Sequence, residues 1–213
     1  MRPIVITVGP LASASATGIA VNQTVTGAAN MVLTASPVTL DTPRHVLITN
    51  AGNDSGITFT ITGTTYGGAV ISETVTGTSG SSVSTVSDFA TVTSIKTSGS
   101  TSVSGASAGT NSVAGSSWVR FDDWAPGLAS LQATISGTVN YTVQTTNDDP
   151  NSPTNAVSIP SVTWVNSLDT NVVSASATKS SYFAYTPIYA RVLLNSGTGS
   201  VTATFLQSSN GPI

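Results

Sequence analysis

Short segments in which apolar and polar residues alternate recur along the whole chain, and helical periodicity is almost absent. In residues 139–144, the side chains of Val139, Tyr141 and Val143 fall on one face of an extended strand, and amides and a threonine fall on the other. This alternation is typical of a strand that buries one face. The pattern therefore predicts an all-β protein.

The predicted strands are short and are separated by Gly, Asn, Asp and Pro. They cover residues 3–8, 44–50, 57–62, 69–76, 90–97, 118–121, 128–136, 138–146, 161–165, 188–195 and 200–207. Segments 136–137 and 195–199 have the composition of turns, and we expect each of them to connect a hairpin. Many short strands with turns between them favour a β-sandwich or a jelly roll, and the lack of a fixed repeat disfavours a β-helix.

The chain has 213 residues, enough for one large β domain or two small ones. The Gly/Ser-rich segment 98–117 has the composition of a flexible linker, although Val103 and Val113 would also allow edge strands within it. We place a domain boundary within or just after this segment. Residues 17–97 would then form one β domain and residues 118–213 another.

Charged residues make up only 7% of the chain, against roughly 25% in an average soluble domain. The abundant β-branched residues argue against disorder, and a weakly charged surface suits a subunit that packs among copies of itself. Binding to a nucleic-acid backbone needs clustered cations. The positive residues stand singly, which excludes that role; they are Arg2, Arg44, Lys96, Arg120, Lys179 and Arg191.

The chain has no cysteine, which excludes disulfides, thiolate metal sites and a cysteine nucleophile, and fits assembly in a reducing cytoplasm. Met1 and Arg2 with the apolar stretch after them resemble a short signal peptide. That stretch alternates at Thr7 and is broken by Gly9 and Pro10, so we expect no signal peptide. We also expect no membrane span, because no stretch approaches the roughly 18 apolar residues of a membrane helix.

Candidate catalytic groups are few. His45 is the only histidine, and strand alternation places it with Leu47, opposite Arg44, Val46 and Ile48. A lone histidine on a strand is more often a packed or surface residue than a general base. The chain has neither a nucleophile elbow nor a Walker-type phosphate loop. We therefore expect no enzyme activity and no catalytic, cofactor-binding or metal site.

Two acidic pairs stand out in so neutral a chain, Asp122-Asp123 and Asp148-Asp149. Adjacent residues of a strand point to opposite faces, so neither pair suits two-carboxylate catalysis. The oxygen-rich segment 147–151 has the ligands that calcium uses. We favour a plain turn there, because Asp and Asn bond their own backbone and Pro150 fixes φ.

The largest aromatic side chains belong either to the core or to an interface, because each of them hides roughly 200 Å² when it is buried. We expect Trp118 and Trp164, together with the cluster at residues 182–185, to lie in the core or at a subunit interface. Trp124, which precedes Ala125 and Pro126, stays undecided. Exposed rings over a groove would instead favour a sugar-binding protein.

Several motifs of the C-terminal part resemble a family of small bacteriophage virion proteins. They are the opening residues 1–4, the strand 137–144, the acidic turn Asp148-Asp149, the Trp164 strand, and the final pair 190–192 and 195–205. The middle region is similar to a phage-associated β module at residues 46–63 and 71–77. In the short relatives, the opening strand runs almost directly into the equivalent of residues 115–123.

The resemblance implies two β-sandwich or jelly-roll-like domains, with residues 11–113 inserted after the first strand of a domain made of residues 1–10 and 114–213. It also implies a virion protein assembled in the host cytoplasm. The leading function is a capsid decoration or cement protein, with the major capsid protein and further copies of the chain as partners. The alternatives are a neck, tail or fibre component that contacts host glycans, a polysaccharide hydrolase, and a bacterial surface adhesin.

Overall fold

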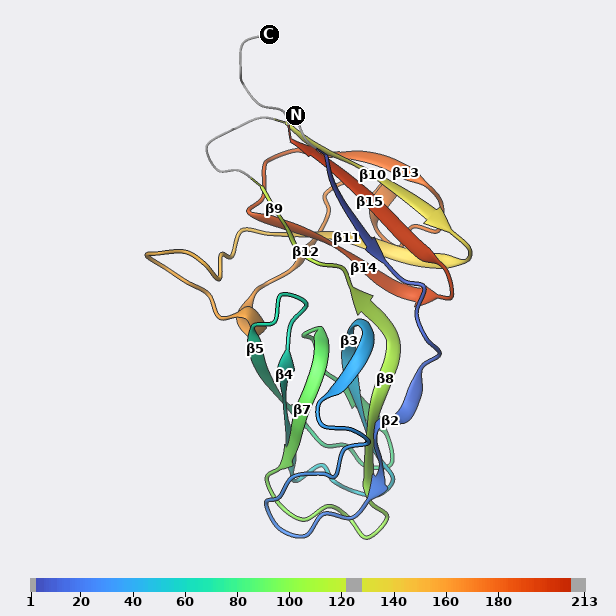
Figure 1. The fold of residues 1–213 in the computed structure, drawn as a ribbon, viewed down its shortest axis with the longest axis vertical. Helices are drawn as coiled ribbons and strands as arrows, with labels where there is room; N and C mark the ends of the chain where they lie inside the picture. Colours follow the sequence, from blue (N-terminus) through green and yellow to red (C-terminus); the bar gives the residue numbers. More distant parts are fainter. Residues whose placement is uncertain (1–2, 122–127, 208–213) are drawn as a thin grey trace. The chain divides into compact units, whose positions relative to one another are not determined.

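The computed structural model describes residues 3–121 and 128–207, and these form an all-β, sandwich-like fold in which the sheets are antiparallel. The chain divides into two compact units (Figure 1). Unit 1 comprises Met1–Leu11 and Val113–Ile213, and unit 2 comprises Ala12–Ser112. The division expected from the sequence, 1–10 with 114–213 and 11–113, differs from these bounds by one residue at each junction. No helix in the described ranges is long and apolar enough to cross a membrane.

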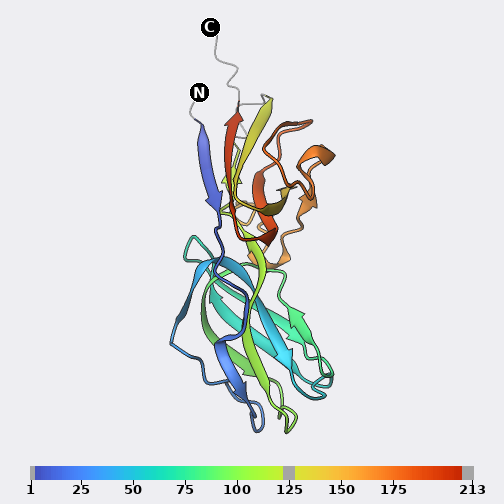
Figure 2. The same cartoon turned by 90° about the vertical axis from the view of Figure 1, so that its right-hand side faces the viewer.

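Unit 1 contains a four-stranded sheet in the order β1-β15-β10-β13. These strands are β1 (Ile4–Val8), β15 (Ser200–Gln207), β10 (Ala129–Ser136) and β13 (Lys179–Phe183). The first strand of the chain therefore pairs with the last, Ile4 opposite Phe205 and Val8 opposite Val201, as the insertion hypothesis requires. Figure 2 shows β1 in blue next to β15 in red.

The second layer of unit 1 is centred on β14 (Tyr189–Gly197), which pairs with β11 (Val139–Thr146) over its whole length. β12 (Val165–Asn166) pairs with the other side of β11, while β9 (Val119–Arg120) and the end of β8 pair with β14. Two short 3-10 turns, η1 (Ile159–Ser161) and η2 (Thr170–Val172), lie in the connections. The inward side chains of both layers form one apolar core.

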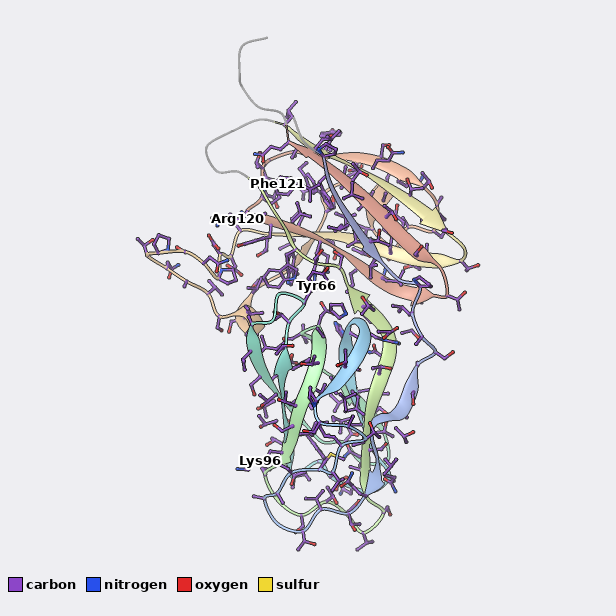
Figure 3. All side chains as sticks on the ribbon, viewed as in Figure 1. Tyr66, Lys96, Arg120 and Phe121 are labelled. Carbon is purple, nitrogen blue, oxygen red and sulfur yellow. The ribbon has the colours of Figure 1, made fainter. Side chains whose placement is uncertain are left out.

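Three phenylalanines occupy this core. The rings of Phe121 and Phe183 meet edge to face at 5.6 Å, and Phe183 stacks on Phe205 at 6.3 Å. Phe121 also contacts Phe205 at 6.1 Å. Phe121 follows β9, Phe183 lies in β13 and Phe205 lies in β15, so their packing holds these three segments of unit 1 together. In Figure 3, Phe121 is labelled next to Arg120, whose side chain is about half exposed.

Unit 2 contains the strands β2 (Ser15–Gln23), β3 (Val38–Asn50), β4 (Thr58–Thr64), β5 (Val70–Thr76), β6 (Ser82–Ser84), β7 (Phe89–Thr97) and β8 (Ala106–Gly115), which runs on into unit 1. β3, β7, β4 and β5 are neighbours in that order. The long β3 pairs with β7 near its start and with β6 near its end, and β2 pairs with β8. Buried side chains such as Ile48, Phe59 and Ile95 fill the interior.

Two connections predicted as hairpins are not hairpins. β10 and β11 belong to different sheets, and so do β14 and β15, so both connections cross between the layers of the sandwich. The crossings contact each other, since the amides of Thr198 and Gly199 both donate to the Thr138 carbonyl at 3.0 Å. A Cβ on Gly199 would lie 2.1 Å from the Ser136 carbonyl oxygen. Glycine therefore serves this close approach and not a two-residue hairpin turn.

The interpretation of residues 98–117 as a flexible linker is wrong for its second half. Residues Ala106–Gly115 form β8, and the side chains of Ala106, Ala108 and Ala114 are fully buried. The small residues that suggested a linker instead allow close packing: a Cβ on Gly109 would lie 1.7 Å from the carbonyl oxygen of Ser15 in β2. The strand predicted at 161–165 is also wrong, because Pro160 lies in η1 and only Val165–Asn166 pairs.

Candidate functional site

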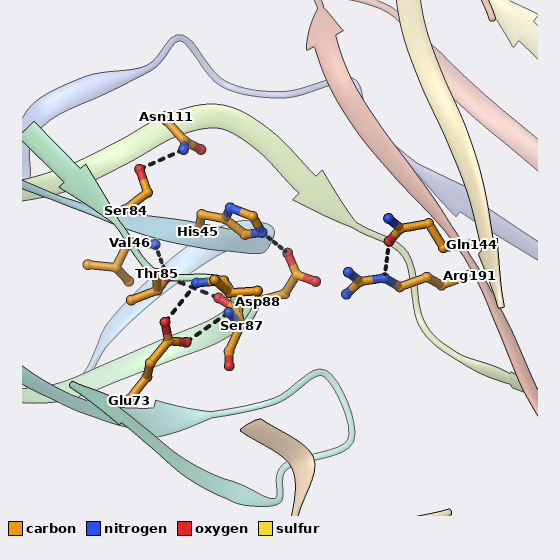
Figure 4. Close-up of polar contacts among 11 residues, drawn as sticks. His45, Val46, Glu73, Ser84, Thr85, Ser87, Asp88, Asn111, Gln144 and Arg191 are labelled. Atoms are coloured by element: carbon orange, nitrogen blue, oxygen red, sulfur yellow. Dashed lines mark hydrogen bonds and ion pairs between the residues drawn. The ribbon is translucent and has the colours of Figure 1, made fainter. Parts of the chain in front are cut away.

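His45 lies on β3 with its imidazole beside Asp88, at 3.5 Å from Nε2 to the carboxylate oxygen. Arg44, Val46 and Ile48 are buried on the opposite face of the strand, so the predicted alternation is confirmed. The surrounding contacts are structural ones: Thr85 accepts from the Val46 amide at 2.9 Å (Figure 4). Both partners belong to unit 2, and the contact is an ion pair only where His45 is protonated.

The carboxylate of Glu73 caps the turn before β7. It accepts hydrogen bonds from the amides of Val86 and Ser87, both at 2.8 Å (Figure 4). A carboxylate that accepts hydrogen bonds from two consecutive backbone amides stabilises the turn that contains them. Glu73 therefore has a structural role in unit 2.

The predicted turn at Asp148-Asp149 is stabilised by bonds within unit 1. Asp149 accepts from the Asn151 amide at 2.8 Å, as in an Asx turn, and pairs with Arg120 at 3.1 Å. Asp148 accepts from the Thr163 amide at 2.7 Å. Both carboxylates therefore have partners in the protein, and within residues 3–121 and 128–207 no group of three acidic or histidine residues could hold a metal ion.

Trp118 and Trp164 meet edge to face, with ring centroids 4.9 Å apart. Trp118 also contacts Tyr189 at 5.7 Å. The guanidinium of Arg191, which is 5% exposed, lies 4.3 Å from the Trp164 ring centroid, and its Nε donates to Gln144 at 3.0 Å. A buried cation on an indole face is a favourable cation–π contact. Both tryptophans are half-buried, so they are packing residues of unit 1 and not open platforms.

The other acidic pair, Asp122-Asp123, and Trp124 lie outside the described residues.

Tyr141, Asp169 and Asp41 have shifted pKa values. Burial raises the pKa of the Tyr141 phenol, which donates to the Ala177 carbonyl. The amide of Asn171 and then the hydroxyl of Ser181 lower the pKa of Asp169. Burial alone would raise the pKa of Asp41, but hydrogen bonds from Ala12 and Arg44 and the Arg44 charge hold it below its usual value. The cause is burial for Tyr141 and hydrogen-bond partners within the protein for Asp169 and Asp41.

The aromatic cluster at residues 182–185 splits between core and surface. Phe183 is 5% exposed and belongs to the core, as predicted. Tyr182 and Tyr185 are 68% and 44% exposed, so a place in the core is wrong for them. Strand alternation on β13 explains the exposure of Tyr182, because a buried Phe183 turns its neighbour outward, whereas Tyr185 lies beyond the end of this strand.

The outer face of the four-stranded sheet in unit 1 carries short neutral side chains. Val5, Thr204, Gln132 and Ser180 are opposite one another in a row that crosses all four strands. Among the described residues that point outward from this sheet none is charged; they are Val5, Thr7, Ser130, Gln132, Thr134, Ser136, Ser180, Tyr182, Ser200, Thr202, Thr204 and Leu206. We call this set the neutral face. β1 and β13 form its two edges.

Comparisons with models of protein families, with curated proteins and with solved structures give no match.

Proposed function

We propose that this chain is a structural protein of a bacteriophage particle that decorates the shell by binding the major capsid protein. The neutral face carries the proposal, since a sheet face without charge brings no charge that must be desolvated at a contact and so suits packing against another protein. The resemblance of residues 137–144 and 190–205 to small virion proteins supports the choice of a phage particle.

The mechanism of such a protein is contact area. A stable interface buries on the order of 1,000 Å² or more, and copies held on a regular lattice add weak contacts by multivalency. Among the described residues β1 is an edge strand of its sheet, and this edge offers a second means of attachment. It carries the uncharged, β-branched sequence Ile4–Val8, which can pair with a strand of a shell subunit or of another copy.

The proposed location is therefore the virion, after assembly in the host cytoplasm. The partners are the major capsid protein and further copies of this chain, and neither catalysis nor nucleic-acid binding is part of the role. The described cations support the last point, because they form no cluster: Arg44 and Arg191 are buried, Arg120 is paired with Asp149, and Lys96 and Lys179 lie in different units.

Counting and locating the protein in purified particles tests this proposal. We expect copies in the hundreds by quantitative gel analysis, and antibody label over the whole shell in negative stain. A dozen copies or fewer, with label at one vertex, would contradict decoration and favour the neck, tail or fibre alternative.

The neutral face can be tested on its own with particles that lack the protein. We expect Gln132→Lys combined with Thr134→Lys to abolish rebinding, because two desolvated charges would have no partner at the contact. Val103→Lys is the matched control, since Val103 is 96% exposed in unit 2. Equal rebinding by both variants would show that another surface makes the contact.

A further inference from the structure

The edge strands of this protein differ in how they are protected against pairing with another chain. An edge presents unpaired backbone N–H and C=O groups, and proteins commonly block it with very short strands, bulges, inward-pointing charges or a covering segment. β9 and β12 have only two residues and β6 has three, while two register shifts interrupt the pairing of β2. By strand alternation, β5 carries the charge of Glu73 on its inward side, between the buried Ile71 and Val75. Each of these edges therefore disfavours a further strand.

The β13 edge of the four-stranded sheet in unit 1 is also blocked. η2 contacts both β13 and β11, so it lies between the two layers on this side of the sandwich. The Ser181 hydroxyl donates to Asp169, the N-cap residue of η2, at 2.7 Å. Lys179 is opposite the buried Ala133 and places a charge on the core side of the same edge. A further strand at β13 would have to desolvate this charge.

β1 forms the opposite edge of this sheet, beside β15 (Figure 2), and its described residues have none of these features. Ile4–Val8 contains no charge, no proline and no register shift, and all five residues are β-branched. Ile4 is opposite the buried Phe205, on the core side of the sheet, yet it is 45% exposed. Val5, on the neutral face, is 58% exposed. An unblocked edge with exposed β-branched side chains is suited to accept another strand.

We propose that β1 pairs antiparallel with β1 of a second copy, around a two-fold axis at Ile6, so that the two four-stranded sheets form one continuous sheet. In this register Ile4 is opposite Val8 of the second copy, and Val5 is opposite Thr7 of the second copy. Side chains of one face then meet side chains of the same face, and the backbone groups that point away from β15 meet their counterparts. Pairs of β-branched residues stabilise a sheet, and Val8 of the second copy would cover part of the exposed Ile4.

The choice of a second copy as the partner follows from the comparison of the edges. β1 alone among the edge strands just described lacks a blocking feature, so the complementary edge that this chain offers is β1 itself. A contact in which identical chains use the same surface is the commonest form of association between them. The described part of β1 is uncharged, so the contact desolvates no charge. Val5 and Thr7 belong to the neutral face, which would continue across the axis.

The inference deepens the attachment through β1 and rests on the proposed function only for its place on a particle. A contact between two five-residue strands is small against the roughly 1,200–2,000 Å² of a standard interface. We therefore expect a Kd of about 0.1–1 mM for the free chain, whereas copies held side by side on a shell would pair more fully by multivalency. The tests use the free chain without particles. Their failure would leave shell decoration to the particle counts, and a failure of decoration would leave the pairing of β1 intact.

Sedimentation equilibrium of the intact chain, from about 10 μM to about 1 mM, measures the association. We expect the average mass to rise toward that of a dimer. Ile4→Lys and Val5→Lys should each raise the Kd at least about tenfold, because a lysine blocks an edge strand and the axis brings two like charges together. Val21→Lys is the matched control, since Val21 is also 58% exposed and lies on β2. A chain that stays monomeric at about 1 mM, or lysine variants at β1 that associate as well as Val21→Lys, would overturn the proposal.

Engineered cysteines test the register, because the chain has none of its own. Val5→Cys and Thr7→Cys chains are oxidised separately and as a mixture. Directly opposite residues have Cα atoms about 4.5–5.5 Å apart, within the range of a disulfide. The two copies of position 5 are diagonal neighbours about 7–8 Å apart, and so are the two copies of position 7, which is beyond that range. We expect at least about fivefold more disulfide-linked dimer in the mixture than in either variant alone. Equal yields in all three samples would overturn the pairing about Ile6.

Discussion

Arg44 donates hydrogen bonds to both carboxylate oxygens of Asp41, at 3.1 and 3.2 Å, from a side chain that is 1% exposed. The same guanidinium donates to the carbonyl of Ala12 at 2.9 Å and to the carbonyl of Asn111. Asp41 in turn accepts from the Ala12 amide at 2.7 Å. Ala12 and Asn111 lie at the two ends of unit 2, so the buried Arg44 guanidinium connects the first residue of this unit to β8, the strand that leaves it.

Replacing Arg44 with Met should destabilise unit 2 strongly. The change leaves Asp41 without its cation and the carbonyls of Ala12 and Asn111 without this donor, and a buried polar group left without a partner costs about 1–3 kcal/mol. Calorimetric unfolding of the full chain measures the effect. Arg120→Met is the control, because Arg120 is about half exposed and a surface pair with Asp149 is worth about 1 kcal/mol or less. Equal shifts for the two variants would contradict the buried role of Arg44.

Acid should destabilise the protein partly through Asp41. Its pKa is lowered in the folded chain, so its contribution to stability is present above the unfolded value near 3.8 and is lost as the pH falls through the folded value. Asp169 has a lowered pKa and acts in the same direction. We expect Asp41→Asn to flatten the acid limb of urea-unfolding free energy against pH. An unchanged acid limb would show that Asp41 is not among the groups that cause the acid loss.

The fold class was predictable from the sequence because alternation reports which face of a strand is buried. β15 follows the predicted range 200–207 without change, and β11 differs by one residue at its start. The alternation of apolar and polar residues within a strand does not report which other strands that strand pairs with. The connections at 137 and 197–199 contain the glycines of a tight turn, yet the layers they join became evident only from the pairing of β14 with β11 and of β15 with β10.

Strands rich in small residues escaped prediction for another reason. Ala106, Ala108 and Gly109 in β8 bury little apolar area each, so their pattern looked like a linker. The exposure of Tyr182 and Tyr185 was hidden in a similar way, since local composition places an aromatic cluster equally well inside or outside. The stacking of Phe183 on Phe205 decided which ring is buried.

Gly63→Ala should destabilise unit 2 more than its small change in size indicates. A Cβ at Gly63 would lie 1.9 Å from the Thr91 carbonyl oxygen and 2.9 Å from the Phe89 ring, at the register shift between β4 and β7. Relief of the clash must move backbone, so we expect a loss of about 2 kcal/mol or more. Gly56→Ala is the matched control because nothing lies within 4 Å of its Cβ position, and a change within about 1 kcal/mol is expected there. Chemical denaturation of both variants separates steric conflict from loss of glycine itself.

Phe205→Ala should open a cavity between the sheets of unit 1. Phe205 is 1% exposed and contacts both Phe121 and Phe183, so we expect a loss of about 3–5 kcal/mol. Leu206→Ala, one residue along on the neutral face, removes a side chain that is 36% exposed and should cost less than about 1 kcal/mol. A reversed order of the two losses would mean that the register of β15 is wrong, because a slip of one residue exchanges the faces.

Hydrogen exchange distinguishes a strand from a linker in residues 98–117. Amides of β8 should exchange slowly where they pair with neighbouring strands, as at Ala108 opposite Ala20 and Ala114 opposite Leu194. The loop at Val103, which is 96% exposed, should exchange at nearly the rate of an unfolded peptide. Proteolysis should follow the same division, with cleavage near 103 and resistance from 106 onward. Fast exchange across the whole segment would restore the linker interpretation and would remove the strand that joins unit 2 to unit 1.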